Sequence, residues 1–167
     1  VVLCQLEIPL ATVEAAAAIA QRHGKPFLLN PAPASKLPAS LLERVALLTP
    51  NEHELALVFG GVAENWRQQL CAHPQRIIMT KGADGAWFAD ANGELAHQAA
   101  FKVSAVDTTG AGDTFNGALA AFWGDDLAKL AHLACAASAL SVTRAGAQGG
   151  MPTREELLAF IAASDQR

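Results

Sequence analysis

The chain has 167 residues, of which 51% are apolar and 17% charged, and its net charge is −4. This length is enough for a domain with a sizeable core, and the composition is that of a compact globular chain rather than a disordered one. The acidic balance argues against a polyanion such as nucleic acid as the main partner. Three widely spaced cysteines without a C-x-x-C pair argue against a disulfide framework or a zinc site, and favour a reducing cytoplasm.

Short apolar runs alternate with helical patterns over the first half of the chain. Residues 1–6 predict a strand that is already under way at Val1, so we interpret the chain as part of a longer one. In chain order we then expect a helix at 12–22, a strand at 27–30, a helix at 41–45, a strand at 46–49, helices at 51–59 and 66–72, and a strand at 77–80. This alternation predicts an α/β fold of three αβα layers with a largely parallel sheet.

The pattern changes in the second half of the chain. The run Asp90-Ala91-Asn92-Gly93 separates two short apolar segments and predicts a hairpin. Thr153 followed by Glu156 predicts a capping box at the start of the last helix. The elements expected here are strands at 86–89 and 95–98 and helices at 113–123 and 127–144.

The most apolar stretch, 127–142, contains Lys129 and His132 and is shorter than the ~20 residues that a membrane span requires. We therefore expect a buried helix there and no membrane partner. No linker divides the sequence, so we expect one domain over residues 1–167.

The densest chemical pattern is Asp107-Thr108-Thr109-Gly110-Ala111-Gly112-Asp113-Thr114-Phe115, directly before an amphipathic helix. Small residues let a ligand approach the backbone, and a helix N-terminus offers unpaired N–H groups and a positive dipole end, so the pattern indicates a phosphate site. Asp113 would repel a resting phosphate, but it fits a site that also holds an attacking hydroxyl. A glycine-rich turn whose aspartate complements the helix dipole explains the same residues.

Two common nucleotide motifs are excluded. The G-x-x-x-x-G-K-[ST] phosphate loop is absent, and Phe115 stands where the third glycine of a dinucleotide fingerprint belongs. A dehydrogenase of the Rossmann type is therefore disfavoured.

The run 107–117 resembles the C-terminal signature of the ribokinase-like carbohydrate kinases, the phosphofructokinase-B family. Further segments resemble that family in the same order: Gln5-Leu6-Glu7, Asn30-Pro31-Ala32-Pro33-Ala34, Thr49-Pro50-Asn51-Glu52, Thr80-Lys81-Gly82 and Val142-Thr143-Arg144-x-Gly146-Ala147-Gln148. The resemblance covers essentially the whole chain. It implies an ATP-dependent sugar kinase in which Asp113 is the catalytic base, while Gly110, Ala111 and Gly112 supply the anion hole for the transferred phosphoryl group.

The resemblance also assigns the nucleotide and magnesium contacts. Asn51 and Glu54 would position Mg²⁺ and the ATP phosphates through water, although the same pair fits a plain helix cap. A strand-to-hairpin turn around residue 82 would contact the nucleotide, with a simple turn as the alternative reading. The ATP-binding residues implied are Asn51, Thr80, Lys81, Gly82, Gly85, Gly112 and Cys135. Cys135 stands where the family commonly has an asparagine near the adenine.

A potassium site is implied beside the anion hole. Its ligands would be the Asp107 carboxylate and the carbonyls of Thr109, Ser141, Arg144 and Gly146. Gly150 is counted among the residues of this potassium site and stands where the family often has a serine. Asp107 is otherwise explained as a turn or cap residue.

Glu7 matches a sugar-contacting glutamate of the family, and residues 30–33 favour D-ribose as the substrate over fructose, another sugar or a nucleoside. The family carries its first sheet strands, a sugar-binding Gly-Gly motif and a small β-sheet lid ahead of the matching segment, and we expect none of these three features in this chain. We therefore expect little or no kinase activity from this chain alone. The open sheet edge would pair with that N-terminal half or in a homodimer, and a nucleotide-binding chain without catalysis is the alternative.

Overall fold

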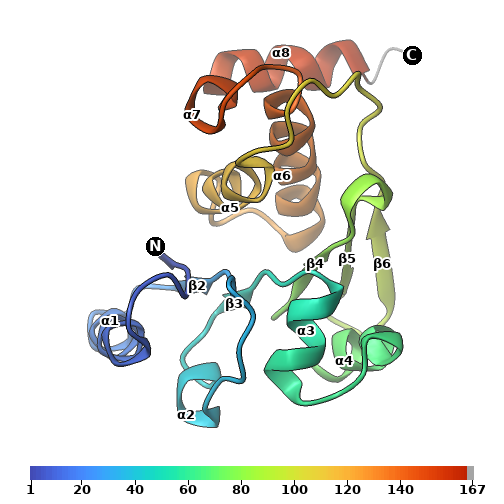
Figure 1. Cartoon of the computed structure of the whole chain (residues 1–167). Coiled ribbons are helices and arrows are strands. Elements are labelled where there is room, and N and C mark those ends of the chain that lie inside the picture. Colours follow the sequence, from blue (N-terminus) through green and yellow to red (C-terminus); the bar gives the residue numbers. More distant parts are fainter. Residues whose placement is uncertain (165–167) are drawn as a thin grey trace. The chain divides into compact units, whose positions relative to one another are not determined.

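The structure is a computed structural model that describes residues 1–164 (Figure 1). Its elements in chain order are β1 (Val2–Cys4), α1 (Leu10–Arg22), β2 (Phe27–Leu29), α2 (Ala39–Leu42), β3 (Leu47–Leu48), α3 (Glu52–Phe59), the 3-10 turn η1 (Ala63–Asn65), α4 (Trp66–Ala72), β4 (Ile78–Thr80), the 3-10 turn η2 (Gly82–Asp84), β5 (Ala86–Ala89), β6 (Leu95–Gln98), α5 (Ala111–Ala121), α6 (Leu127–Ser141), α7 (Ala147–Gly150) and α8 (Arg154–Ser164).

The chain divides into two compact units. Unit 1 comprises Val1–Lys81 and Trp87–His97, and unit 2 comprises Gly82–Ala86 together with the described residues from Gln98 onward. The single domain expected over residues 1–167 stays a prediction.

Unit 1 is built on a parallel sheet, as the alternating pattern predicts. In β1 and β2, Val2 pairs with Phe27, and β2 pairs in turn with β3 in the same direction. Single parallel bridges, Leu48 to Ile77 and Asn51 to Thr80, continue the pairing from the β3 segment to the β4 segment. The carboxyl ends of these strands therefore lie along one edge, which is where ligands bind in open α/β sheets.

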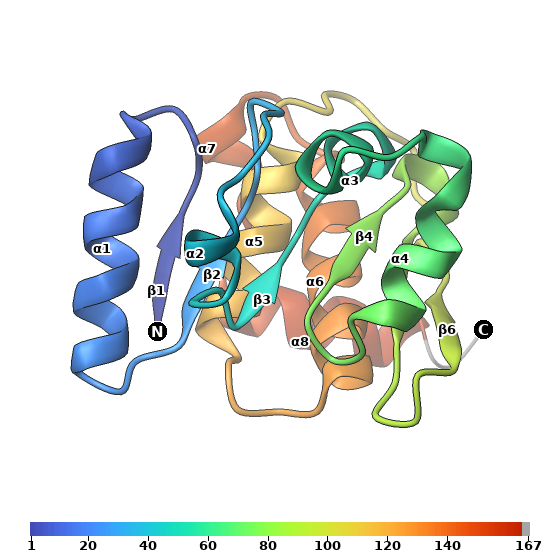
Figure 2. The same cartoon turned by 90° about the horizontal axis from the view of Figure 1, so that it is seen from below.

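Helices α1 to α4 cover one face of this sheet (Figure 2). Alternate strand residues point to opposite faces, and those on the helix side form one apolar cluster with the helices, among them Val13, Ala17, Phe27, Leu29, Leu41, Leu48, Leu55, Leu70 and Met79. Each fully buried leucine contributes about 1.5–3 kcal/mol. The cluster thus fixes the sheet edge that carries the polar loops.

The predicted hairpin is present between β5 and β6. The Asp90 Oδ1 atom accepts hydrogen bonds from the N–H groups of Asn92 and Glu94, and Gly93 has a φ of +79°. A short polar side chain and a glycine therefore close the turn, as the residue types predict.

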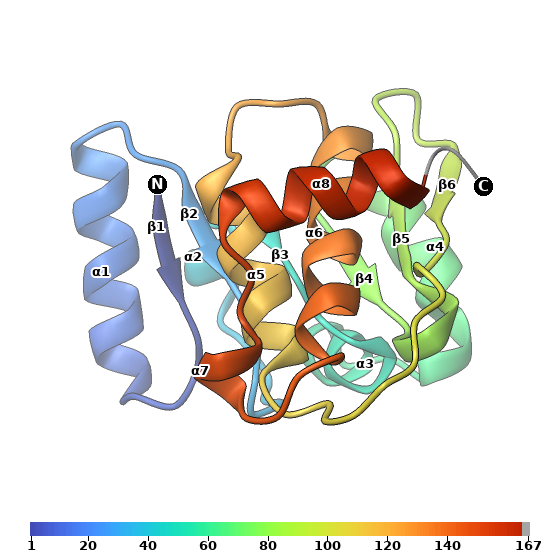
Figure 3. The ribbon, with the colours of Figure 1, turned by 90° about the horizontal axis from the view of Figure 1, so that it is seen from above.

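Unit 2 is a helical layer in which α5 packs beside α6 and α8 crosses α6 (Figure 3). The Asp126 side chain caps α6 through the Lys129 N–H. The predicted capping box of α8 is confirmed, because Glu156 N–H donates to Thr153 Oγ1 and Thr153 N–H donates to Glu156 Oε2. None of the helices within residues 1–164 has the length and apolar character needed to span a membrane.

Element boundaries differ from the predictions where groups distant in the chain bind carbonyls near a helix end. The helix expected at 41–45 runs over Ala39–Leu42, since the Arg76 guanidinium binds the carbonyls of Leu42 and Val45 at 2.8 and 2.7 Å. The helix expected at 127–144 ends at Ser141, and the Val142 carbonyl accepts the N–H groups of two residues before α5. Helix α7 was not predicted, because its glycines favour a loop.

Substituting Gly85 tests how closely unit 2 is packed at the start of β5. Gly85 has a φ of +97°, and a methyl group there would collide with the backbone of Gln98 and Ala100. We expect Gly85→Ala to lower the free energy of unfolding by about 3 kcal/mol or more. Urea denaturation followed by circular dichroism measures this loss.

Gly60→Ala is the matched control. Gly60 also has a positive φ, +68°, but its Cβ position is open, so the substitution costs only about 1–2 kcal/mol of backbone strain. Equal losses for the two variants would contradict the packing that we describe around Gly85.

Candidate active site

The N-terminus of α5 presents unpaired backbone donors. Gly110 is the N-cap in a left-handed conformation, and Thr114 N–H donates to its carbonyl at 2.9 Å. The Ala111 N–H is already engaged by the Thr108 carbonyl at 3.2 Å. Within residues 1–164, the N–H groups of Gly110, Gly112 and Asp113 form no hydrogen bond, so they remain available to an anion.

The two glycines of this turn have different surroundings. A Cβ on Gly110 would lie 2.9 Å from the Cβ of Ala147, so this glycine is packed against the chain. A Cβ on Gly112 would have no atom within 4 Å, so this glycine borders open space. A ligand can therefore approach the turn from the side of Gly112.

Asp113 lies in the first turn of α5 with an exposed side chain. Its carboxylate forms no hydrogen bond or ion pair within the described residues. The turn is braced from the other side by Asn116, whose Nδ2 donates to the Gly112 carbonyl at 2.9 Å. The signature pattern includes Asn116, but its bracing role becomes visible only in the structure.

The Asp107 carboxylate connects the segment before α5 to the segment after α6. Its Oδ1 accepts the Thr109 N–H at 2.9 Å, and its Oδ2 accepts the Gly146 N–H at 2.8 Å. The Thr109 hydroxyl and these two N–H groups lower the pKa of Asp107 from 3.8 to about 2. The carboxylate is therefore ionised at neutral pH.

The residues expected to ligate potassium lie within unit 2. Of the expected carbonyls, that of Ser141 accepts the Arg144 N–H at 3.3 Å and that of Gly146 accepts the Gly150 N–H at 2.9 Å. Gly150 is buried, and a Cβ there would lie 2.6 Å from the Ser141 oxygen. Among residues 1–164, no group of three or more His, Cys, Asp or Glu side chains could hold a metal ion.

Asn51 and Glu54 form a complete capping box at α3. Asn51 Oδ1 accepts the Glu54 N–H at 2.9 Å, and Glu54 Oε2 accepts the Asn51 N–H at 2.8 Å. Burial raises the pKa of Glu54. The interpretation of Asn51 and Glu54 as a helix cap is therefore confirmed. The magnesium role stays a prediction, for which the second carboxylate oxygen of Glu54 is the available atom.

Asn51 and Thr80 are brought together by the bridge between their segments, and Thr80 N–H donates to the Pro50 carbonyl at 2.9 Å. Lys81 forms an ion pair with Glu52 at 3.2 Å. The remaining nucleotide residues have contrasting environments: Gly82 is exposed, while Gly85 is buried against backbone.

Glu7 and Cys135 differ in exposure. Glu7 is exposed after β1 and forms no hydrogen bond or ion pair within the described residues. Cys135 is buried in α6, and burial raises the pKa of its thiol to about 12. Cys135 is therefore a protonated, weakly polar thiol at neutral pH.

A cavity of about 210 Å³ lies in unit 1, lined among others by Leu42, Phe59, His73 and Arg76. None of the residues predicted for a functional site lines it. The surface that lines the cavity is mostly apolar.

Residues 2–154 match the pfkB family of carbohydrate kinases. The chain belongs to this family. It is 40% identical over 158 residues to the ribokinase of Bacillus subtilis, with 93% of this chain and 53% of that protein covered.

Two solved structures of similar proteins contain ligands. Arabidopsis thaliana ribokinase complexed with ribose and ATP has a TM-score of 0.84 and 29% identity, covering 95% of this chain and 55% of that one. A putative ribokinase II from E. coli with ATP and Mg²⁺ has a TM-score of 0.73 and 27% identity, covering 91% and 53%. The predicted ribokinase-like α/β fold is confirmed, and the chain spans about half the length of the curated relatives it matches.

Acid titration tests the link made by Asp107. Because the pKa of Asp107 is lowered from 3.8 to about 2 in the folded chain, its stabilising effect is fully present above about pH 4 and is lost as the pH falls toward 2. We expect Asp107→Asn to unfold at lower urea concentration than the parent chain at pH 7, by a difference that shrinks below pH 4.

Glu155→Gln, which replaces an exposed carboxylate of α8, is the control and should show no comparable difference. A gap between Asp107→Asn and the parent chain that stays constant from pH 7 to pH 3 would contradict the two hydrogen bonds assigned to Asp107.

Proposed function

We propose that this chain supplies the phosphoryl-transfer site of an ATP-dependent sugar kinase, with D-ribose as the substrate. The observation that carries the proposal is the start of α5, where unpaired N–H groups of Gly110 and Gly112 border open space and Asp113 exposes its carboxylate. A helix N-terminus stabilises the negative charge of a phosphoryl group, and the adjacent carboxylate is a proton acceptor.

The reaction follows from these two groups. A primary alcohol oxygen of the sugar attacks the γ-phosphorus of ATP, the bond from that phosphorus to the bridging oxygen breaks, and ADP leaves. The alcohol proton passes to the Asp113 carboxylate. Each well-placed N–H donor contributes about 2.7–4 kcal/mol to such a transition state, and a positioned base contributes roughly 10²–10⁴-fold in rate.

Magnesium and potassium have separate proposed positions. Asn51 and Glu54 would hold Mg²⁺ with the ATP phosphates through water, since Mg²⁺ prefers oxygen ligands and keeps several waters. The Asp107 carboxylate and the carbonyls of Thr109, Ser141, Arg144 and Gly146 would hold K⁺. The residues fit an oxygen-ligated cation, because a carbonyl that accepts one N–H has a second lone pair.

Nucleotide contacts are proposed for Thr80, Lys81 and Gly82, with Cys135 near the adenine. Gly85 acts through the turn that it permits rather than through direct contact, since backbone fills the space beside its Cα atom. Glu7, exposed in the segment that follows β1, is proposed to contact the sugar.

The proposed substrate rests on similarity to known proteins, and the proposed partner rests on the open edge of the sheet. The Arabidopsis relative is described with ribose and ATP, which favours D-ribose over fructose, another sugar or a nucleoside.

In the described sheet, β1 has a neighbour on one side only, and Leu3 is partly exposed. Such an edge can receive another strand, and we propose a polypeptide equivalent to the uncovered half of the relatives as the partner. A homodimer is the alternative. A cytoplasmic location is also proposed.

Substitution of Gly112 tests the phosphate site directly. A Cβ in a helix projects toward the helix N-terminus, so Gly112→Ala places a methyl group where the phosphate would bind. We expect ATP affinity to fall at least roughly tenfold, while the urea midpoint stays equal or rises because alanine is the better helix former. Isothermal titration calorimetry with Mg²⁺ and K⁺ measures the affinity.

Two variants serve as controls for Gly112→Ala. Gly117→Ala makes the same change at an exposed helical glycine with an open Cβ position and should bind ATP normally. Asp113→Asn removes a negative charge beside the phosphate and should bind ATP as well or better. Unchanged affinity in Gly112→Ala, with measurable binding by the parent chain, would refute the phosphate site.

The turnover of this chain is predicted to be low. With D-ribose, ATP, Mg²⁺ and K⁺ in a coupled ADP-release assay, we expect ATP binding with little or no sugar phosphorylation, since these residues contain no lid to exclude water. Turnover at an ordinary enzyme rate, abolished by Asp113→Asn, would show that the uncovered half is dispensable. Absence of ATP binding would contradict the proposed function itself.

A further inference from the structure

The segment between α6 and α8, residues 144–153, supports the start of α5 at two points. The N–H of Gly146 donates to Asp107 Oδ2 at 2.8 Å. Ala147 lies so close to Gly110 that a Cβ on that glycine would come within 2.9 Å of it. We name residues 144–153 the support loop, because it contacts both Asp107 and Gly110.

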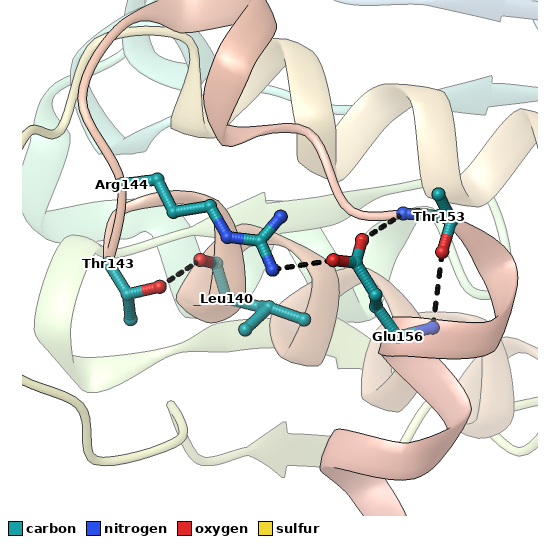
Figure 4. A network of polar contacts seen from close by, with 5 residues as sticks. All are labelled: Leu140, Thr143, Arg144, Thr153 and Glu156. Atoms are coloured by element: carbon teal, nitrogen blue, oxygen red, sulfur yellow. Dashed lines mark hydrogen bonds and ion pairs between the residues drawn. The ribbon is translucent and has the colours of Figure 1, made fainter.

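A single carboxylate contacts both ends of the support loop (Figure 4). Glu156 Oε1 accepts a hydrogen bond from Arg144 Nη2 at 2.7 Å, at the first residue of the loop. Glu156 Oε2 accepts the N–H of Thr153 at 2.8 Å, at the last residue of the loop. The Glu156 side chain thus joins the two ends of the support loop.

Further hydrogen bonds hold the backbone at the Arg144 end of the support loop. Arg144 N–H donates to the Ser141 carbonyl at 3.3 Å, and the Thr143 hydroxyl donates to the Leu140 carbonyl at 2.7 Å (Figure 4). These bonds hold the last turn of α6 and the backbone from which the Arg144 side chain departs. The support loop contains Gly146, Gly149 and Gly150. Glycines increase the conformational freedom of the backbone, and the contacts at the two ends of the loop restrain it.

The Arg144–Glu156 ion pair is too exposed to serve mainly as a source of global stability. The two side chains are 39% and 40% exposed, and an ion pair at such a site contributes little to global stability. The pair instead restrains the geometry of the loop, because both ends of one glycine-rich segment bind the same carboxylate.

We propose that Glu156 is a positioning residue for the phosphate site: by binding Arg144 and Thr153 it holds Gly146 and Ala147 against Asp107 and Gly110. The expected effect of Glu156 on ATP binding rests on the proposed function, whereas its effect on the support loop does not. Neither the signature motif nor the predicted capping box requires the bond to Arg144.

Glu156→Gln separates the two bonds of this carboxylate. Glutamine serves as well as glutamate in a capping box, so one amide oxygen can still accept the Thr153 N–H. The other carboxylate oxygen becomes an NH₂ donor, which cannot accept a hydrogen bond from Arg144. Glu155→Gln makes the same change one residue earlier, where the side chain is exposed and forms no hydrogen bond or ion pair within the described residues.

Amide hydrogen exchange of Gly146, followed by NMR, tests the loop without any ligand. We expect Glu156→Gln to exchange at least roughly tenfold faster at Gly146 than the parent chain, with an unchanged urea midpoint and unchanged exchange at the core of α6. Glu155→Gln should match the parent chain at all sites. Unchanged Gly146 exchange in Glu156→Gln would overturn the proposal.

ATP titration calorimetry tests the consequence for the site. We expect Glu156→Gln and Arg144→Met to weaken ATP binding by similar factors, and the double variant to weaken it no further, since both remove the same bond. Faster Gly146 exchange with parental ATP affinity would overturn the link from the loop to the phosphate site. If the parent chain binds no ATP, the proposed function fails while the exchange measurement still decides the role of Glu156 in the loop.

Discussion

The pair of hydrogen bonds accepted by Asp107 is the constraint on which unit 2 depends. One carboxylate oxygen binds Thr109 N–H in the turn before α5, and the other binds Gly146 N–H in the support loop. The Thr109 hydroxyl and both of these N–H groups favour the charged form of the aspartate, which is why its pKa is low. The start of α5 therefore has its position set from a segment that follows it by more than thirty residues in the chain.

Three glycines around this constraint serve different purposes. Gly110 is packed against Ala147 and has a left-handed backbone, Gly150 leaves room for the Ser141 carbonyl, and Gly112 faces open space. The first two allow segments to approach closely, and only the third makes room for a ligand. A glycine-rich signature is thus partly a packing requirement and partly a binding surface.

Two capping boxes of the same local type show how structure and function can share a residue. In α3 the carboxylate of Glu54 is partly buried, whereas in α8 the second oxygen of Glu156 binds Arg144. The cap satisfies N–H groups that every helix leaves unpaired. The oxygen that remains after capping is then available for a cation, a water molecule or a loop.

Local patterns in the sequence determined the parallel strands, the hairpin at Asp90, the capping boxes at Asn51 and Thr153, and the exposed Asp113 at a helix start. Those features depend on hydrogen bonds and side-chain periods that span a few residues, so residue type and spacing predict them. Only the tertiary structure decided that α2 ends early at the Arg76 guanidinium, that Ala111 N–H is engaged while Gly112 N–H is not, and that Glu156 binds Arg144. These outcomes depend on which groups meet after packing, and no local pattern in the chain encodes such meetings.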